Sequence, residues 1–256
     1  MYRDNSKLLQ AALVVLVFFI VTGGWEFYVW VSETPAFVLP APSVVGKQLF
    51  SLLDNAMFWD NFWVTMYEVL MGYVLGILIA VVLGVLISQI RLLDLSLMPY
   101  IVAFQTIPSV ALAPIFLQWF GYGLASKIVM AALIAFFPML VNVIAGLQAS
   151  GRDEVQMLKA FGASRLQILM KVRVPNSLPY VFAGLGLGVV FALVGAIVAE
   201  FVGAQKGLGK MILQFNEQFN IAGMFAILIV LAAIGMTMHS IVGMAKRRVV
   251  FWAGDH

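Results

Sequence analysis

The residues that could carry out chemistry are few and far apart in this chain of 256 residues. The nearest approach to a phosphate-binding loop is GAQKGLGKM, Gly203 to Met211. That pattern needs a glycine where Ala204 stands and a serine or threonine where Met211 stands. His239 stands alone, no His-Glu-x-x-His motif or cluster of carboxylates appears, and the sequence contains no cysteine. The sequence therefore predicts no catalytic residue, no metal site and no cofactor in this chain.

The composition indicates a membrane protein. Hydrophobic residues make up 63% of the chain and charged residues only 11%, whereas a soluble domain carries roughly 25% charged residues. A helix that spans a bilayer needs about 20 apolar residues. Six runs meet this requirement: Leu9–Val31, Val64–Gln89, Leu97–Phe120, Ser126–Leu147, Leu178–Val202 and Ile221–Ala245. We therefore predict an all-α membrane protein with about six transmembrane helices.

The basic residues indicate which way the spans run. With the N-terminus in the cytoplasm, eleven Lys and Arg residues fall on the inner side and four on the outer side. Inner loops of membrane proteins are enriched in Lys and Arg, so we expect both termini in the cytoplasm. Because the basic residues lie at the ends of the apolar runs, the net charge of +3 does not indicate a nucleic-acid partner.

The chain divides at the end of its first outer segment. The first apolar run lacks a following small-x-small cleavage site and is interpreted as a retained anchor. The stretch SVVGKQLFSLLDN after it is amphipathic and is expected to form an external helix. We expect an N-terminal part at residues 1–63, a transmembrane domain at residues 64–256, and a cytoplasmic loop at residues 148–177.

The cytoplasmic loop is expected to form two short helices. Ser150 and Asp153 have the spacing of a capping box, and Gly162 suits the end of the helix that follows. Ser164 and Gln167 form a second capping box. Pro175 is expected to end the second helix, because proline lacks the amide hydrogen.

The first of these helices carries an apolar face. Val155, Leu158 and Phe161 recur at roughly helical spacing on a segment too short to be stable alone in water. This face needs a partner, which is either the underside of the bundle or another protein.

The loop resembles a known family. The run EVQMLKAFGASRLQILMKVRVPNSLP resembles the EAA loop of binding-protein-dependent ABC importer permeases: Gly162 matches the glycine of that pattern and Leu178-Pro179 its closing Leu-Pro. The triplet position holds Gln156-Met157-Leu158, which departs from the pattern in all three residues. The stretches FVLPAPSVVGKQLF, PSVALAPIFLQWFGYG, FFPMLVNVIAGL and GAIVAEFVGAQKGLG resemble the permeases for nitrate, sulfonates, taurine and thiamine-precursor pyrimidines.

The resemblance implies a type I ABC importer-like permease. Such a subunit moves a small polar or anionic solute, delivered by an external binding protein, across the inner membrane. The implied partners are ABC ATPase subunits, which bind ATP and Mg²⁺, a second permease copy, the solute-binding protein and the lipid bilayer. The subunit itself is expected to have no ATPase activity. The residues expected to couple to the ATPase are Glu154, Gln156, Met157, Leu158, Lys159, Phe161, Gly162, Ala163, Ser164 and Arg165.

Polar residues inside the apolar runs are candidates for the solute pathway. Unpaired amides are costly in hydrocarbon, so Gln105, Gln118 and Asn142 are expected to face the pathway or a packed helix. Glu200 lies at the glycine-rich exit of the fifth run, where its carboxylate could pair with a base, accept hydrogen bonds from freed amides, or meet the solute at an outer gate.

Two other classes of function stay open. An ion-coupled secondary carrier that acts without an ATPase would use ionisable residues in the membrane, and Glu26, Glu68 and Glu200 are candidates for that role. Neither an Asp/His relay through the middle of the spans nor an inverted repeat is present in the sequence, which counts against such a carrier. The third alternative is a membrane scaffold without transport.

Overall fold

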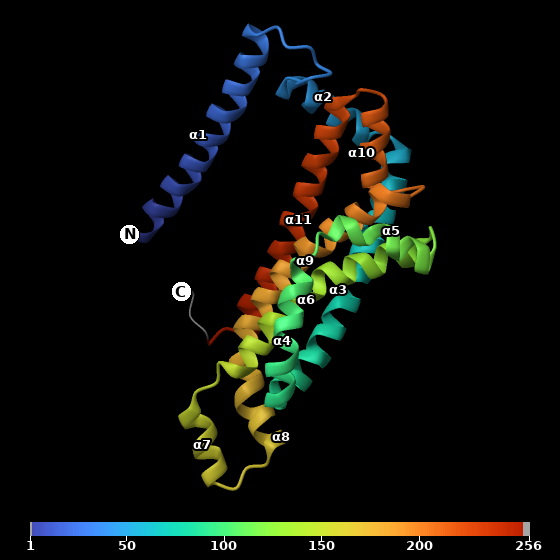
Figure 1. Cartoon of the computed structure of the whole chain (residues 1–256). Coiled ribbons are helices and arrows are strands. Elements are labelled where there is room, and N and C mark those ends of the chain that lie inside the picture. Colours follow the sequence, from blue (N-terminus) through green and yellow to red (C-terminus); the bar gives the residue numbers. More distant parts are fainter. Residues whose placement is uncertain (1, 253–256) are drawn as a thin grey trace. The chain divides into compact units, whose positions relative to one another are not determined.

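The computed structural model describes the backbone of residues 2–252, while the side chains of residues 2–8, 10, 11 and 152 lie outside the description. All regular structure in residues 2–252 is helical (Figure 1). Five helices of the described chain are long and apolar enough to cross a membrane, or up to six if one bent pair counts as a single span. The predicted fold class is confirmed. The chain separates into two compact units, Met1–Trp59 with Met211–Val230, and Asp60–Lys210 with Leu231–His256.

The first unit contains an apolar helix and a short helix that follows it. Helix α1 spans Tyr2–Val31 and α2 spans Pro42–Leu53, with Pro42 in its first turn, where proline is tolerated. Glu26 of α1 accepts hydrogen bonds from the amide and the hydroxyl of Ser43, at 2.9 and 2.7 Å. Trp25 packs against Phe225 with ring centroids 5.5 Å apart. The Glu26 carboxylate therefore fixes the start of α2 to α1.

The second unit is built around α6. It contains most of α3 (Ala56–Gln89), α6 (Leu124–Gln148), α9 (Val174–Gly203) and the later part of α11 (Ile221–Val249). Glycines of α3 and α9 face α6 so closely that an added Cβ would collide with it. These glycines are Gly72, Gly76 and Gly84 of α3, and Gly184, Gly188 and Gly195 of α9. Small residues let backbones approach in a membrane, where hydrophobic burial does not drive helices together.

The third predicted span is not one straight helix. The chain forms α4 (Arg91–Gln105) and α5 (Ser109–Phe120), which are bent by 97° relative to each other. Pro108 is the N-cap of α5, and the bend lies at residues 106–108. Proline cannot donate an amide hydrogen and disfavours helical geometry in the residue before it, which explains the break. The prediction of one span rested on the length of the apolar run and therefore missed it.

The loop at residues 148–177, which is predicted to be cytoplasmic, contains the expected short helix and one confirmed capping box. Helix α7 spans Arg152–Ala160, and Gly162 has a φ of +76°, a region that favours glycine. The Ser164 amide donates to Gln167 Oε1 at 2.7 Å, and the Gln167 amide donates to Ser164 Oγ at 3.2 Å. Helix α8 therefore begins at Arg165, as that spacing predicted.

Two expectations for this loop are wrong. The N-cap of α7 is Gly151 and makes no side-chain cap, so Ser150 and Asp153 form no capping box. Pro175 does not end the second helix: α8 (Arg165–Ile168) continues through the π-helix η1 (Leu169–Arg173) into α9. A wider turn changes the hydrogen-bond pattern before the proline, which lets the helix pass a residue without an amide hydrogen.

We expect Gly195→Ala to weaken the packing of α9 on α6. A Cβ at Gly195 would lie 2.7 Å from Ala131 Cα and 3.0 Å from the Met130 carbonyl oxygen, and overpacking of this kind costs about 1–3 kcal/mol. The control is Gly243→Ala in α11, where no atom lies within 4 Å of the added Cβ. Thermal unfolding in detergent should show a lower Tm for the first variant only, and equal Tm values would contradict the packing assignment.

Candidate functional site

Three side chains bind three consecutive backbone amides where the chain turns from α9 into α10 (Leu208–Glu217). The amide of Gly207 donates to Asn61 Oδ1 at 2.6 Å, and that of Leu208 to Thr65 Oγ1 at 2.8 Å. The amide of Gly209 donates to Glu200 Oε2 at 2.5 Å. The Thr65 hydroxyl in turn donates to Glu200 Oε1 at 2.6 Å. We call Asn61, Thr65 and Glu200 the loop clamp.

Helix geometry brings the loop clamp together. Asn61, Thr65 and the nearby Glu68 are separated by four and three residues along α3, so they share one face of that helix. The first amides of a helix have no partner inside it and favour a negative charge, which is what Glu200 supplies to the start of α10. Gly207 has a φ of +127°, and a Cβ there would overlap the Glu200 carboxylate.

A second carboxyl group lies beside the loop clamp. Glu68 and Glu200 are both 0% exposed, and their carboxyl groups are neighbours. Within the described residues, Glu68 forms no hydrogen bond outside this pair of carboxyl groups. The Glu68 carboxyl group is therefore enclosed within the second unit.

A buried lysine lies near these carboxyl groups. Lys127 is 3% exposed, and its Nζ donates to the carbonyl oxygens of Tyr122 and Gly123, each at 2.9 Å. Glu68 and Lys127 line a cavity of about 390 Å³, together with Gln205 and Lys206. This end of the second unit thus combines buried charges of both signs with an opening that polar groups line.

The three amides expected on the pathway lie in different surroundings. Gln105 lines a cavity of about 350 Å³ between the α4–α5 bend, α6 and Phe191 of α9. Asn142 faces Gly184 of α9 and donates to the Pro138 carbonyl oxygen at 2.8 Å. Gln118 is exposed on α5. Asn142 therefore takes part in helix packing, and Gln105 alone of the three lines a described cavity.

The residues expected to couple to an ATPase lie within α7 and directly after it. Met157 and Phe161 are 56% and 82% exposed, whereas Val155 and Leu158 are half-buried. Glu154 Oε2 accepts a hydrogen bond from Asn176 Nδ2 at 2.8 Å, which fixes α7 to the start of α9. The helix thus presents large apolar side chains outward from a base that is held in place.

Asn61 and Thr65 were not among the predicted site residues. Their signal is the recurrence of polar residues at 61, 65 and 68 on one face of an otherwise apolar helix. A polar stripe of this kind indicates a buried polar partner, and here that partner is a backbone segment 143 residues away for Thr65.

Comparison with known proteins gives consistent matches over most of the chain. Residues 72–251 match the family described as "Binding-protein-dependent transport system inner membrane component". The chain is 35% identical to a probable ABC transporter permease protein of Haemophilus influenzae, over 91% of this chain and 93% of that protein. It is 36% identical to a riboflavin transport system permease protein of Chloroflexus aurantiacus, over 95% of this chain and 89% of that protein.

A solved structure shares the fold. A chain from the inward-facing MetNI methionine ABC transporter matches with a TM-score of 0.65 and 21% identity, covering 75% of this chain and 96% of that chain.

We expect Thr65→Val to loosen the start of α10. Valine keeps the shape but leaves the Leu208 amide and one Glu200 oxygen without a partner, at about 1–3 kcal/mol. The control is Thr237→Val, since the Thr237 hydroxyl donates only to the Ala233 carbonyl of its own helix. Hydrogen exchange of amides 207–209 should accelerate in the first variant and not in the second, and equal protection in both would contradict the role of Thr65.

Proposed function

The chain belongs to the family of binding-protein-dependent transport system inner membrane components, and on that premise we propose how it works as the permease subunit of an ATP-driven importer. The observation that carries the proposal is the family match across residues 72–251. This region includes the whole of α7 and its exposed apolar side chains. In an ATP-driven importer built on this chain, the ATPase belongs to another subunit, because this sequence contains no phosphate-binding loop.

The energy source is a pair of ABC ATPase subunits that bind α7. Met157 and Phe161 are the anchors, because large exposed apolar side chains on a short helix are stabilised by insertion into a partner's groove. Gly162 ends the helix with a positive φ, so the chain can turn directly into α8. ATP and Mg²⁺ bind to those subunits, and this chain binds no cofactor of its own.

The assembly is a membrane complex with partners on both sides. A second copy of this chain completes the pathway, and an external solute-binding protein delivers the solute. Both termini lie in the cytoplasm, which the excess of Lys and Arg on that side supports. The complex lies in the inner membrane, and nothing in the arrangement of basic residues favours a nucleic-acid partner.

The solute is small and polar or anionic. Relatives include permeases named for riboflavin, formylaminopyrimidine, aliphatic sulfonates and taurine, which are all small molecules. Within this chain, the cavity beside Gln105 lies at the α4–α5 bend and contacts α6 and α9. We propose that Gln105 faces the pathway, while Asn142 shapes it by packing on α9, and Gln118 lies at its edge.

Cysteine cross-linking tests the proposed assembly directly, because the described chain contains no cysteine. We expect Met157→Cys to form cross-links to an ATPase subunit. The control is Phe219→Cys, at an exposed position that follows α10 and is predicted to lie outside. It should form no such cross-link and should react with a membrane-impermeant thiol reagent added to whole cells.

Two results would contradict the importer. One is a reaction of Met157→Cys with the impermeant reagent from outside, which would reverse the orientation. The other is solute uptake by proteoliposomes that an ion gradient drives in the absence of ATP and the ATPase, which would indicate a secondary carrier.

Glu200 belongs to the outer gate in this proposal, because its carboxylate holds the loop that closes the outer end of α9. We expect Glu200→Gln to reduce ATP-driven uptake several-fold while assembly and resting ATP hydrolysis stay near wild type. An amide can accept from Gly209 but cannot also accept from Thr65, so the loop is held less firmly. Loss of assembly would instead assign Glu200 a purely structural role, and normal uptake would contradict the gate.

A further inference from the structure

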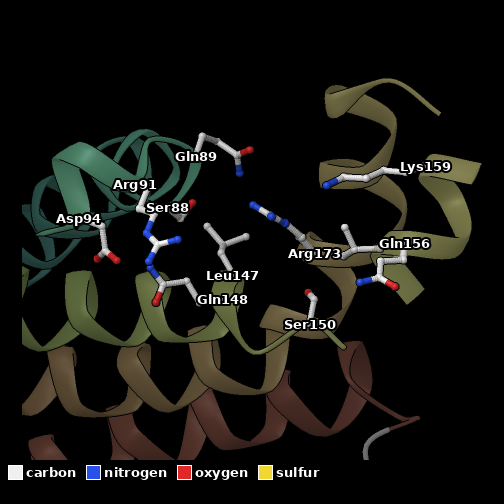
Figure 2. A pocket seen from close by; sticks show the side chains of 11 residues that line it. Ser88, Gln89, Arg91, Asp94, Leu147, Gln148, Ser150, Gln156, Lys159 and Arg173 are labelled. Carbon is white, nitrogen blue, oxygen red and sulfur yellow. The ribbon is translucent and has the colours of Figure 1, made fainter. Parts of the chain in front are cut away.

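A hollow beside α7 is lined by basic and neutral polar side chains. Its volume is about 560 Å³, within the range of roughly 300–1,000 Å³ typical of small-molecule sites. It lies where α3 and α6 end, where α4 begins, and against one face of α7 (Figure 2). The charged residues that line it are Arg91, Lys159, Arg173 and Asp94.

The charges of this hollow are not balanced. Three cations and one carboxylate leave a net charge of two positive units. Among the described residues, Arg91, Lys159 and Arg173 form no ion pair and no side-chain hydrogen bond. Figure 2 shows Arg173 and Lys159 turning their charged ends toward Gln89, with Arg91 across the hollow. Like charges that line one hollow repel each other unless an anion lies between them.

Neutral polar side chains around the hollow can donate hydrogen bonds as well. Gln89, Gln148, Gln156 and Ser150 line it, as does Ser88, whose hydroxyl already donates to the Val85 carbonyl oxygen at 2.9 Å. The Ser150 hydroxyl oxygen is buried and has no hydrogen-bond partner in the described chain. A buried hydroxyl without a partner is uncommon in a folded protein. The set of two guanidinium groups, one ammonium group, hydroxyls and amides matches the oxygens of a phosphate group.

The position of the hollow identifies the source of the phosphate. Gln89 is the last residue of α3 and Gln148 is the last residue of α6, so the hollow lies where spanning helices leave the hydrocarbon. Basic pockets between spanning helices on the cytoplasmic side bind anionic lipid headgroups. We propose that this hollow binds the phosphate headgroup of an anionic phospholipid from the inner leaflet, which braces α7 against the ends of α3, α4 and α6.

The two faces of α7 make this site distinct from the ATPase interface. Val155, Gln156 and Lys159 line the hollow, whereas Met157 and Phe161 point away from that set at helical spacing. The headgroup would therefore contact one face of α7 and the ATPase the opposite face. This inference rests on the proposed function only for the cytoplasmic placement of α7.

Lipid retention by the purified importer complex tests the site. The complex is exchanged into micelles that contain phosphatidylglycerol or phosphatidylcholine, and native mass spectrometry counts the bound lipid. We expect wild type to retain phosphatidylglycerol selectively, and Arg91→Gln and Arg173→Gln each to lower its occupancy roughly tenfold, since each variant removes a charged hydrogen-bond donor. Arg173→Lys keeps the positive charge but lacks the two-pronged guanidinium group, so its lipid occupancy should lie between those of wild type and Arg173→Gln.

A matched control removes one charge elsewhere on the same side. Lys246→Gln in the last turn of α11 does not touch the hollow, and it should retain phosphatidylglycerol as wild type does. If Arg173→Gln fails to assemble, Arg91→Gln and Arg173→Lys decide the result. Because the assay measures binding and not uptake, its failure would leave the importer function standing.

Three results would overturn the proposal. The first is equal retention of phosphatidylglycerol in the hollow variants and in Lys246→Gln. The second is binding of inorganic phosphate that the same variants abolish while lipid retention is unchanged, which would indicate a soluble anion. The third is loss of ATPase subunits from the variants with lipid retained, which would make these cations part of a protein interface.

Discussion

Backbone groups at a helix break have no water to bind inside a membrane, and this chain supplies polar side chains for them. Asn61, Thr65 and Glu200 take the amides at the start of α10. Lys127 takes two carbonyl oxygens at the turn between α5 and α6. An unsatisfied backbone group costs several kcal/mol in hydrocarbon. A break in a spanning helix therefore requires a buried polar side chain that binds the exposed backbone groups.

The same constraint shapes the packing of the helices. Lipid chains are as apolar as leucine, so association depends on close contact between backbones. The glycines of α3 and α9 allow that contact with α6, where Ala131 meets both Gly72 and Gly195. Asn142 lies within this packed region, where its amide donates to the Pro138 carbonyl and its Cβ faces Gly184. The polar side chain of Asn142 therefore takes part in helix packing inside the bundle.

Local patterns in the sequence predicted the features that depend on neighbouring residues. The apolar runs predicted five of the six spans as single helices, Gly162 predicted a positive φ, and the Ser164–Gln167 spacing predicted a capping box, because each depends on residues close in sequence. Features that depend on distant partners were missed. Thr65 meets its partner 143 positions along the chain, and no periodicity within α3 identifies that partner.

Prolines were the least predictable residues. Pro108 separates α4 from α5 at a 97° bend, while Pro175 lies inside a continuous helical segment. The local chemistry of the two is the same, since both lack the amide hydrogen. What differs is the backbone before them: η1 rearranges its hydrogen bonds ahead of Pro175, whereas the α4 helix ends ahead of Pro108.

The passage of the helix through Pro175 connects the two ends of the second unit. Residues Arg165–Gly203 form one helical run of 39 residues, which at 1.5 Å per residue is roughly 60 Å long. Its first end follows α7, which is tied to it through the Glu154–Asn176 hydrogen bond. Its other end carries Glu200 of the loop clamp. A displacement of α7 by an ATPase would therefore reach the loop clamp through one helix, with no flexible joint at the proline to absorb it.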